Sequence, residues 1–140
     1  MINNKLVIFC VIALISFILL VGCENKEFVK DYEDYKKLYV EVVDEFVPKD
    51  SDYELEKLKD QFIVEKLDQM DKIAEKMSNN ASTKREKQML SNVLQFNEGL
   101  KFLKYAANNK DYLTEDERGR VTGEVLDADV DRKDIEEGNL

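Results

Sequence analysis

The scarcity of helix-breaking residues is the feature that most restricts the fold of this chain. Its 140 residues include one proline and five glycines, and long stretches carry apolar residues three or four positions apart. That spacing places apolar residues on one side of a helix, and no alternating pattern typical of strands extends far enough to compete. The pattern predicts an all-α fold.

Three long amphipathic helices are expected. The first covers about 25–46 and ends before Pro48, because proline disfavours a helical conformation in the residue before it. The second covers about 51–80 and the third about 83–109, and both open with a capping box. Short loops between long helices predict an antiparallel bundle. The stripe of the first helix comprises Phe28, Tyr32, Tyr35, Tyr39, Val42 and Phe46.

The last thirty residues are acidic, with 11 acidic and 4 basic residues in 111–140. A third capping box starts at Thr114, but apolar residues are sparse after it. We expect a short helix over about 115–126 that continues into a partly disordered acidic end. Gly119 and Gly123 are four residues apart, a spacing that lets helices approach closely, and this pair is a candidate for docking the tail helix on the bundle.

The N-terminal 22 residues are typical of a secretory signal peptide. Lys5 precedes an uncharged run over 6–22, which is shorter than the roughly 20 residues of a comfortable membrane-spanning helix. The run ends in Leu20-Val21-Gly22-Cys23, which resembles the lipobox of bacterial lipoproteins. The resemblance implies cleavage between Gly22 and Cys23 and attachment of diacylglyceryl to the Cys23 thiol. An uncleaved anchor helix remains the alternative.

These expectations divide the chain into four parts: a signal peptide over 1–22, a lipidated tether over 23–27, a three-helix domain over 28–110 and an acidic helix or tail over 111–140. The resemblance implies a protein held by its lipid on the extracytoplasmic face of the cell membrane. The absence of His and Trp, the single Pro and the many Lys, Asn and Ile residues suggest an AT-rich genome. Together with the resemblance to a lipobox, this favours a Gram-positive bacterial host.

The residue inventory offers little for catalysis. The net charge is −9 and there is no histidine, and both cysteines, Cys10 and Cys23, lie at the N-terminus. The charge excludes a basic nucleic-acid footprint, and it also excludes a polybasic patch that binds anionic lipid. Without histidine there is neither the commonest general base nor the commonest zinc ligand, and no phosphate-binding glycine motif occurs. We predict no enzymatic activity and no cofactor.

One short stretch resembles the start of a calcium loop. Asp127, Asp129 and Asp131 alternate as the first ligands of an EF-hand do. Position 6 is Arg132 where glycine is needed, and position 12 is Gly138 where a glutamate is needed. A solvated acidic tail is favoured, and a weak divalent-cation site is the alternative.

The tyrosine row of the first helix has two interpretations. Tyr32, Tyr35 and Tyr39 fit an ordinary core stripe, and they also fit a partly exposed face for a protein partner, since tyrosine is favoured at interfaces. Both interpretations stay open at this point.

The function favoured by these observations is a membrane-anchored, non-catalytic protein-interaction module at the cell surface, of which immunity and exclusion lipoproteins are one form. The first alternative is a small helical lipoprotein that binds a ligand or lipid. Such a protein would need apolar volume inside the bundle, lined by Phe62, Met70, Met77, Phe96 and Phe102. A second alternative is that residues 16–22 of the released signal peptide act as a mating pheromone.

Overall fold

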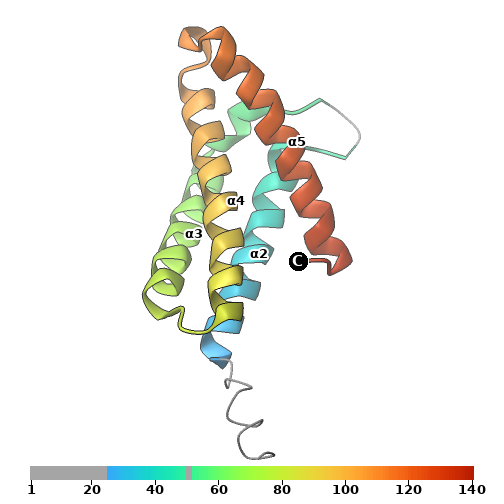
Figure 1. Ribbon diagram of the computed structural model, residues 1–140. Coiled ribbons are helices and arrows are strands. Elements are labelled where there is room, and N and C mark those ends of the chain that lie inside the picture. Colours follow the sequence, from blue (N-terminus) through green and yellow to red (C-terminus); the bar gives the residue numbers. More distant parts are fainter. Residues whose placement is uncertain (1–24, 50–51) are drawn as a thin grey trace, which may run out of the picture.

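The computed structural model describes residues 25–49 and 52–140, and within these ranges it contains helices and no strand. The all-α prediction is confirmed. Four α-helices and two short 3-10 helices follow one another along the chain (Figure 1): α2 (Lys26–Phe46), η1 (Leu55–Lys59), α3 (Gln61–Asn80), α4 (Lys84–Asn108), η2 (Lys110–Tyr112) and α5 (Glu115–Glu137).

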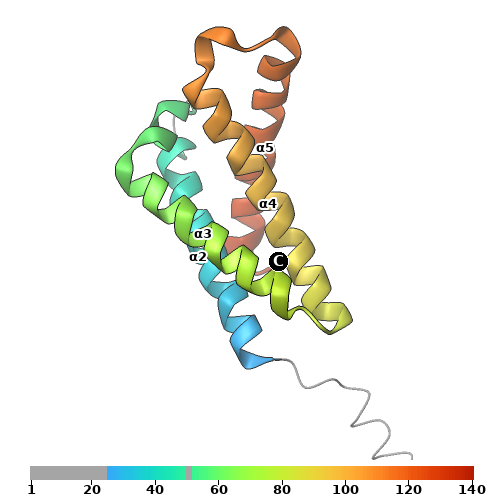
Figure 2. The ribbon, with the colours of Figure 1, turned by 90° about the vertical axis from the view of Figure 1, so that its left-hand side faces the viewer.

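Helices α2, α3 and α4 run in alternating directions and form a bundle, and α5 packs against α2 and α4 (Figures 1 and 2). The N-terminus of α2, the C-terminus of α3 and the N-terminus of α4 meet at one end of the bundle. The C-terminus of α4, η2 and the N-terminus of α5 form the opposite end. The molecule is therefore elongated, with two distinct ends.

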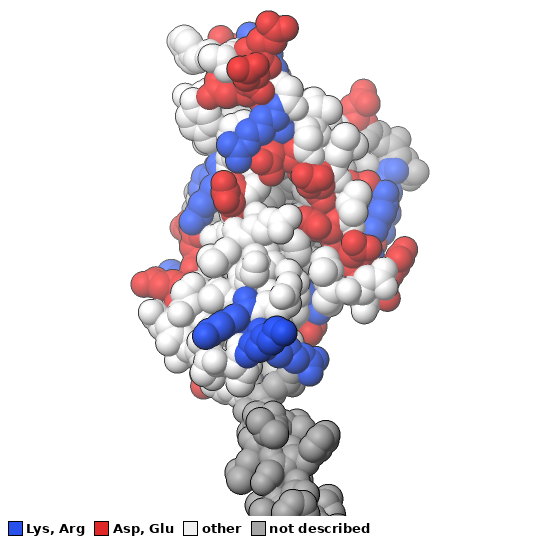
Figure 3. Space-filling model, viewed as in Figure 1, with Lys and Arg blue, Asp and Glu red and all other residues white. Residues whose placement is uncertain are grey.

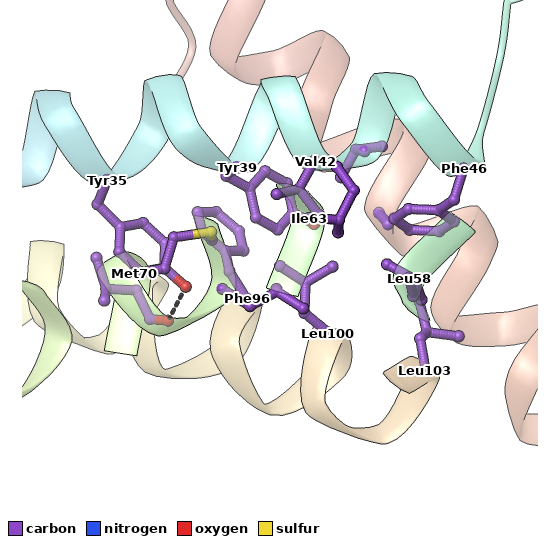
Figure 4. Close-up of a cluster of buried hydrophobic side chains, with 14 of the residues drawn as sticks. Tyr35, Tyr39, Val42, Phe46, Leu58, Ile63, Met70, Phe96, Leu100 and Leu103 are labelled. Carbon is purple, nitrogen blue, oxygen red and sulfur yellow. Dashed lines mark hydrogen bonds between the residues drawn. The ribbon is translucent and has the colours of Figure 1, made fainter. Parts of the chain in front are cut away.

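The stripe of α2 is the centre of the core. All six of its predicted residues are at most 3% exposed. They face buried side chains from η1, α3 and α4, among them Leu58, Met70 and Leu100 (Figure 4). The Tyr39 and Phe96 rings lie 4.7 Å apart. Burial of each such side chain contributes roughly 1.5–3 kcal/mol, which makes this row the main source of stability.

The second predicted helix is broken in two. Residues Leu55–Lys59 form a 3-10 helix, Asp60 is extended (φ −62°, ψ 134°), and α3 begins at Gln61. Leu58 and Ile63 are both buried although they are five residues apart, a spacing that would place them on different sides of one continuous helix. The break lets both side chains enter the core. Ser51, the first residue of the predicted capping box, lies outside the described residues.

The other two capping boxes form as predicted. The side chain of Thr83 accepts a hydrogen bond from the Glu86 backbone N–H, and the Glu86 side chain accepts one in return. Thr114 and Glu117 do the same at the start of α5. These pairs set where α4 and α5 begin.

The acidic tail differs from its prediction. Instead of a short helix with a disordered end, α5 continues to Glu137 and stops at Gly138, whose φ of 76° is the left-handed C-terminal cap. Its few apolar residues are small, and polar contacts complete the packing. Arg132, only 2% exposed, donates from Nη1 to Asp44 Oδ1 (2.8 Å) and to the Val47 carbonyl (2.7 Å).

The glycines of α5, Gly119 and Gly123, do not have the role that the sequence predicts for them. A Cβ at Gly119 or Gly123 would meet nothing within 4 Å, so the predicted close approach at this pair is wrong. A Cβ at Gly99 of α4 would lie 2.8 Å from Glu124 Oε2, the end of a side chain that reaches across from α5.

Across 25–49 and 52–140, none of the helices combines the length and the apolar character that crossing a membrane requires.

Candidate functional site

A hollow among the described residues lies at the end of the bundle that is remote from Asn25. We call it the distal groove. It has a volume of about 810 Å³ and is bordered by residues 53–56, the C-terminal turns of α4, η2 and the first turns of α5. The antiparallel path brings these segments together, because α4 ends and α5 begins at this end.

The distal groove has an apolar floor and a charged rim. Leu55, Ala106, Ala107, Leu113 and Val121 line the floor, and Glu54, Glu56, Lys110, Asp111 and Arg118 line the rim. The small side chains of Ala106 and Ala107 leave the space, because a larger residue on this last turn of α4 would fill it. An apolar centre within a polar rim is typical of binding surfaces.

Local contacts hold the rim in place. Arg118 Nε donates to the Leu113 carbonyl (3.2 Å), and Glu56 forms an ion pair with Lys59 that lowers the pKa of Glu56 through a hydrogen bond. The pKa of Glu117 is also lowered, first by the backbone N–H of Thr114. Glu56 and Glu117 are thus engaged in an ion pair and a helix cap, which is a structural role.

Exposed tyrosines gather at this end. Tyr112 of η2 is 86% exposed, Tyr53 at the groove is 44% exposed, and Tyr105 on α4 is 48% exposed and donates to Glu117 (3.4 Å). Sequence reasoning did not single out these three. The available signal was their position next to helix ends and off the apolar stripe, where burial does not explain a large aromatic residue.

The predicted partner face on α2 is wrong. Tyr32, Tyr35 and Tyr39 are at most 3% exposed, because α2 is covered by the other helices along its whole stripe. The Tyr35 hydroxyl donates to the Val93 carbonyl (3.2 Å; Figure 4). Burial raises the pKa of both Tyr35 and Tyr39. These residues belong to the core, as the other interpretation had it.

The candidate cation site is also contradicted. Asp127, Asp129 and Asp131 lie on a continuous helix rather than in a loop, so alternate side chains point in different directions. Asp129 pairs with Arg132 and Lys133, whereas Asp131 accepts from Tyr39 (3.5 Å). Across residues 25–49 and 52–140, no group of three or more Asp or Glu side chains is arranged to hold a metal ion.

The apolar volume expected for a ligand between the helices is filled. Met70, Met77 and Phe96 are packed in the core. Phe62 is 61% exposed beneath Lys66, and the Phe102 ring is covered by the Arg120 guanidinium at 4.0 Å. The predicted lipidation and cleavage residues, Cys23 and Gly22, lie outside the described residues.

Comparison with known proteins finds no match: no family model, curated protein or solved structure is significantly similar to the chain. The function is therefore argued from the arrangement of the two ends of the molecule.

Proposed function

We propose that this protein is a lipid-anchored, non-catalytic interaction module at the extracytoplasmic face of the cell membrane, and that it binds a partner protein through the distal groove. One observation carries the proposal: the groove and its exposed tyrosines lie at the end of the bundle opposite Asn25, which follows Cys23 by two residues. A lipid on Cys23 would then hold the groove away from the membrane.

The distances support this arrangement. Two residues span at most about 7 Å, so an acylated Cys23 would keep the Asn25 end near the lipid headgroups. Ala106 follows the start of α4 at Lys84 by 22 positions, and a rise of 1.5 Å per residue puts the groove roughly 33 Å along the helix. An upright bundle would present its groove well beyond the headgroup layer.

The surface of the groove fits a protein partner. Tyrosine supplies a large apolar area at small entropic cost, and it is enriched among residues that dominate binding energy. Tyr53 lines the groove, and exposed Tyr112 directly follows Lys110 and Asp111 of its rim. Charges of both signs on the rim favour one orientation of the partner. Immunity or exclusion is a form of this function in which the partner is an incoming macromolecule.

The ligand-binding alternative draws on the same groove. Its volume falls within the roughly 300–1,000 Å³ of small-molecule sites. The apolar floor would suit a small apolar ligand. Against this, the groove is open to solvent.

Site-specific crosslinking tests the proposal. A photoreactive phenylalanine analogue replaces Tyr112 in the full chain, expressed in its host, and the same analogue replaces Phe62 as the control, since both side chains are strongly exposed. We expect one protein to be captured from the Tyr112 position and not from the Phe62 position. A Cys23→Ala form should lose both the lipid and the capture.

Equal capture from both positions would contradict a role for the groove. A small molecule that stays bound to the purified protein in native mass spectrometry, and is lost in Ala107→Leu, would favour the ligand-binding alternative. Unchanged acyl labelling of Cys23→Ala would contradict the lipoprotein assignment.

A further inference from the structure

The end of the bundle next to the tether is tied together by specific contacts. The backbone N–H of Asn25 donates to Glu86 Oε1 (3.2 Å), which joins the start of α2 to the start of α4. Lys76 near the end of α3 pairs with Glu27 (2.7 Å) and Asp31 (2.9 Å) of α2. Residues far apart in sequence therefore form one surface at this end.

This surface is basic although the chain is acidic. Residues 25–31 and 76–88 include six basic and three acidic residues, whereas the rest of the described chain includes 14 basic and 25 acidic residues. Of the three acids, Glu86 is buried, and Glu27 and Asp31 pair with Lys76. Figure 3 shows Lys and Arg side chains gathered at the lower end, beside the grey residues, with acidic and basic side chains interspersed over the rest of the face.

The exposed basic side chains of this end lean toward the tether. Side chains on an α-helix tilt toward its N-terminus, and both α2 and α4 begin here. Lys26 and Lys30 of α2 and Lys84 and Lys87 of α4 are exposed, and we call these four residues the basic end. This tilt brings their ammonium groups within reach of the side from which the chain enters the bundle.

Helix stability does not explain this placement. Cations in the first turn of a helix oppose its macrodipole. The first turn of α5, at the opposite end of the molecule, has the favourable arrangement, with three acidic residues at 115–117. The start of α4 instead has basic residues on both sides of Glu86. A binding role for these lysines accounts for a sequence that runs against the dipole.

We propose that the basic end docks on the headgroup phosphates of anionic phospholipids and holds the bundle upright on the membrane. This inference rests on the proposed lipidation of Cys23, which would place the basic end within a few ångströms of the surface. Screening limits electrostatic attraction to about 8 Å at physiological salt, so the lysines nearest the tether act more strongly on the surface than the acidic residues farther along the bundle. Each lysine that reaches such a surface strengthens attachment about fivefold.

Fluorescence quenching of the lipidated full chain in vesicles tests the inference. A fluorophore is placed on Asn79→Cys, beside the basic end, and in a second preparation on Asp111→Cys at the far end. Vesicles are phosphatidylcholine alone, or phosphatidylcholine mixed with phosphatidylglycerol, and both contain a headgroup quencher. We expect the Asn79→Cys label to be more strongly quenched in the anionic vesicles than in the neutral ones, and the Asp111→Cys label to be unquenched in the anionic vesicles.

The double variant Lys84→Gln, Lys87→Gln should lose the additional quenching of the Asn79→Cys label in anionic vesicles, and high salt should have the same effect. The matched control Lys104→Gln, Lys110→Gln removes two charges near the other end and should keep it. Equal quenching in neutral and anionic vesicles, or in the Lys84→Gln, Lys87→Gln variant, would overturn the inference while the protein still co-sediments with vesicles. Failure to co-sediment would instead refute the lipid anchor itself.

Discussion

At the scale of single residues, Glu86 has the largest number of structural partners at the tether end. Its carboxylate accepts hydrogen bonds from the N–H and hydroxyl of Ser82 (both 2.8 Å), from the Thr83 N–H (2.9 Å) and from the Asn25 N–H (3.2 Å). These donors, Thr83 first, lower the pKa of Glu86 from 4.5 to about 2. One buried side chain thus caps α4 and fixes the start of α2.

Replacing Glu86 with Gln should lower the melting temperature at neutral pH, because an amide cannot accept all four hydrogen bonds. In the parent protein the ionised Glu86 contributes stability above pH 4.5, and that contribution is lost as the pH falls toward 2. The difference between parent and variant should therefore shrink over this window. Thermal unfolding followed by circular dichroism measures it, with exposed Glu75→Gln as the control. A constant difference would refute the role of the charge.

The pKa of Asp131 is shifted in the opposite direction from that of Glu86. Partial burial raises its pKa from 3.8 to about 6, with Asp127 and Asp134 adding repulsion, and only the hydrogen bond from Tyr39 favours its charge. Between these pH values the folded state binds more protons than the unfolded state. The contribution of Asp131 to the stability of the fold therefore falls as the pH rises from about 4 to about 6.

Asp131→Asn should stabilise the protein at pH 7.5 by about 1 kcal/mol, a figure reduced for solvent screening of this half-buried carboxylate. At pH 4 the variant and the parent should differ little. Urea unfolding at the two pH values provides the measurement. Destabilisation at pH 7.5 would mean that the hydrogen bond from Tyr39 outweighs the cost of the charge.

At the scale of elements, α5 depends on a few contacts rather than on a broad apolar face. Val121, Val125 and Ala128 are its buried apolar residues. Arg132 adds contacts to both Asp44 and the Val47 carbonyl, and Lys36 donates to the Leu140 carbonyl oxygen (2.8 Å). Helix α5 is therefore docked largely by polar contacts to α2 and to Val47, the residue that follows α2.

Arg132→Ala should destabilise the protein by about 2–3 kcal/mol, because it removes charged hydrogen bonds and leaves the Val47 carbonyl without its partner. The cost stays below that of a fully buried ion pair, since Asp44 is 44% exposed. Hydrogen exchange should show the largest increase in α5. Lys133→Ala, which removes only an exposed pair with Asp129, is the control and should change stability by less than about 0.5 kcal/mol.

Substitution of the tail glycines tests how α5 packs. Gly119→Ala and Gly123→Ala should each stabilise the protein by about 0.5–1 kcal/mol, because alanine favours the helix and nothing lies within 4 Å of the new methyl group. Thermal unfolding of each variant checks this. A loss of stability would show that the glycines are packed closely after all. Gly99→Ala, which must displace the end of the Glu124 side chain, should gain less.

The sequence predicted elements whose stability comes from an apolar stripe. The stripe of α2 and the capping boxes at Thr83 and Thr114 are local patterns, and all of them appear in the structure. The break at Asp60 and the full length of α5 depend on contacts between distant residues. In the sequence, Arg132 is one charge within a charged segment. Only the fold brings it beside Asp44, which is 88 positions away in the chain.

The candidate site could be predicted less well from the sequence, because it also depends on contacts between distant residues. The distal groove combines residue 53 with residues of α4 and α5, and no local pattern indicates that these segments meet. Tyrosine attracted attention in the sequence, but the row on α2 was the wrong set, because regular spacing indicates burial. The exposed tyrosines, such as Tyr112, are irregularly placed.

At the scale of the whole molecule, the fold places basic residues at one end and acidic residues at the other. The net charge of the chain does not reveal this separation. A net charge of −9 argued against a lipid-facing basic patch, yet helices that begin at the tether end bring Lys26 and Lys84 to one surface. The opposite end has the acidic first turn of α5 and the groove. A short tether and a basic end would act together. The tether would limit the distance of the bundle from the membrane, and the basic end would set the angle between the bundle and the membrane.

Lengthening the tether separates these two effects. A ten-residue Gly-Ser insertion between Glu24 and Asn25 adds roughly 17 Å of flexible reach, which exceeds the screening length. Energy transfer from a donor on Asp111→Cys to acceptors in anionic vesicles should change from one narrow distance to a broad distribution, while the protein stays attached. A distribution that stays narrow would mean that the basic end orients the bundle without help from the tether. A broad distribution in the parent protein would mean that the groove is not held at a fixed height.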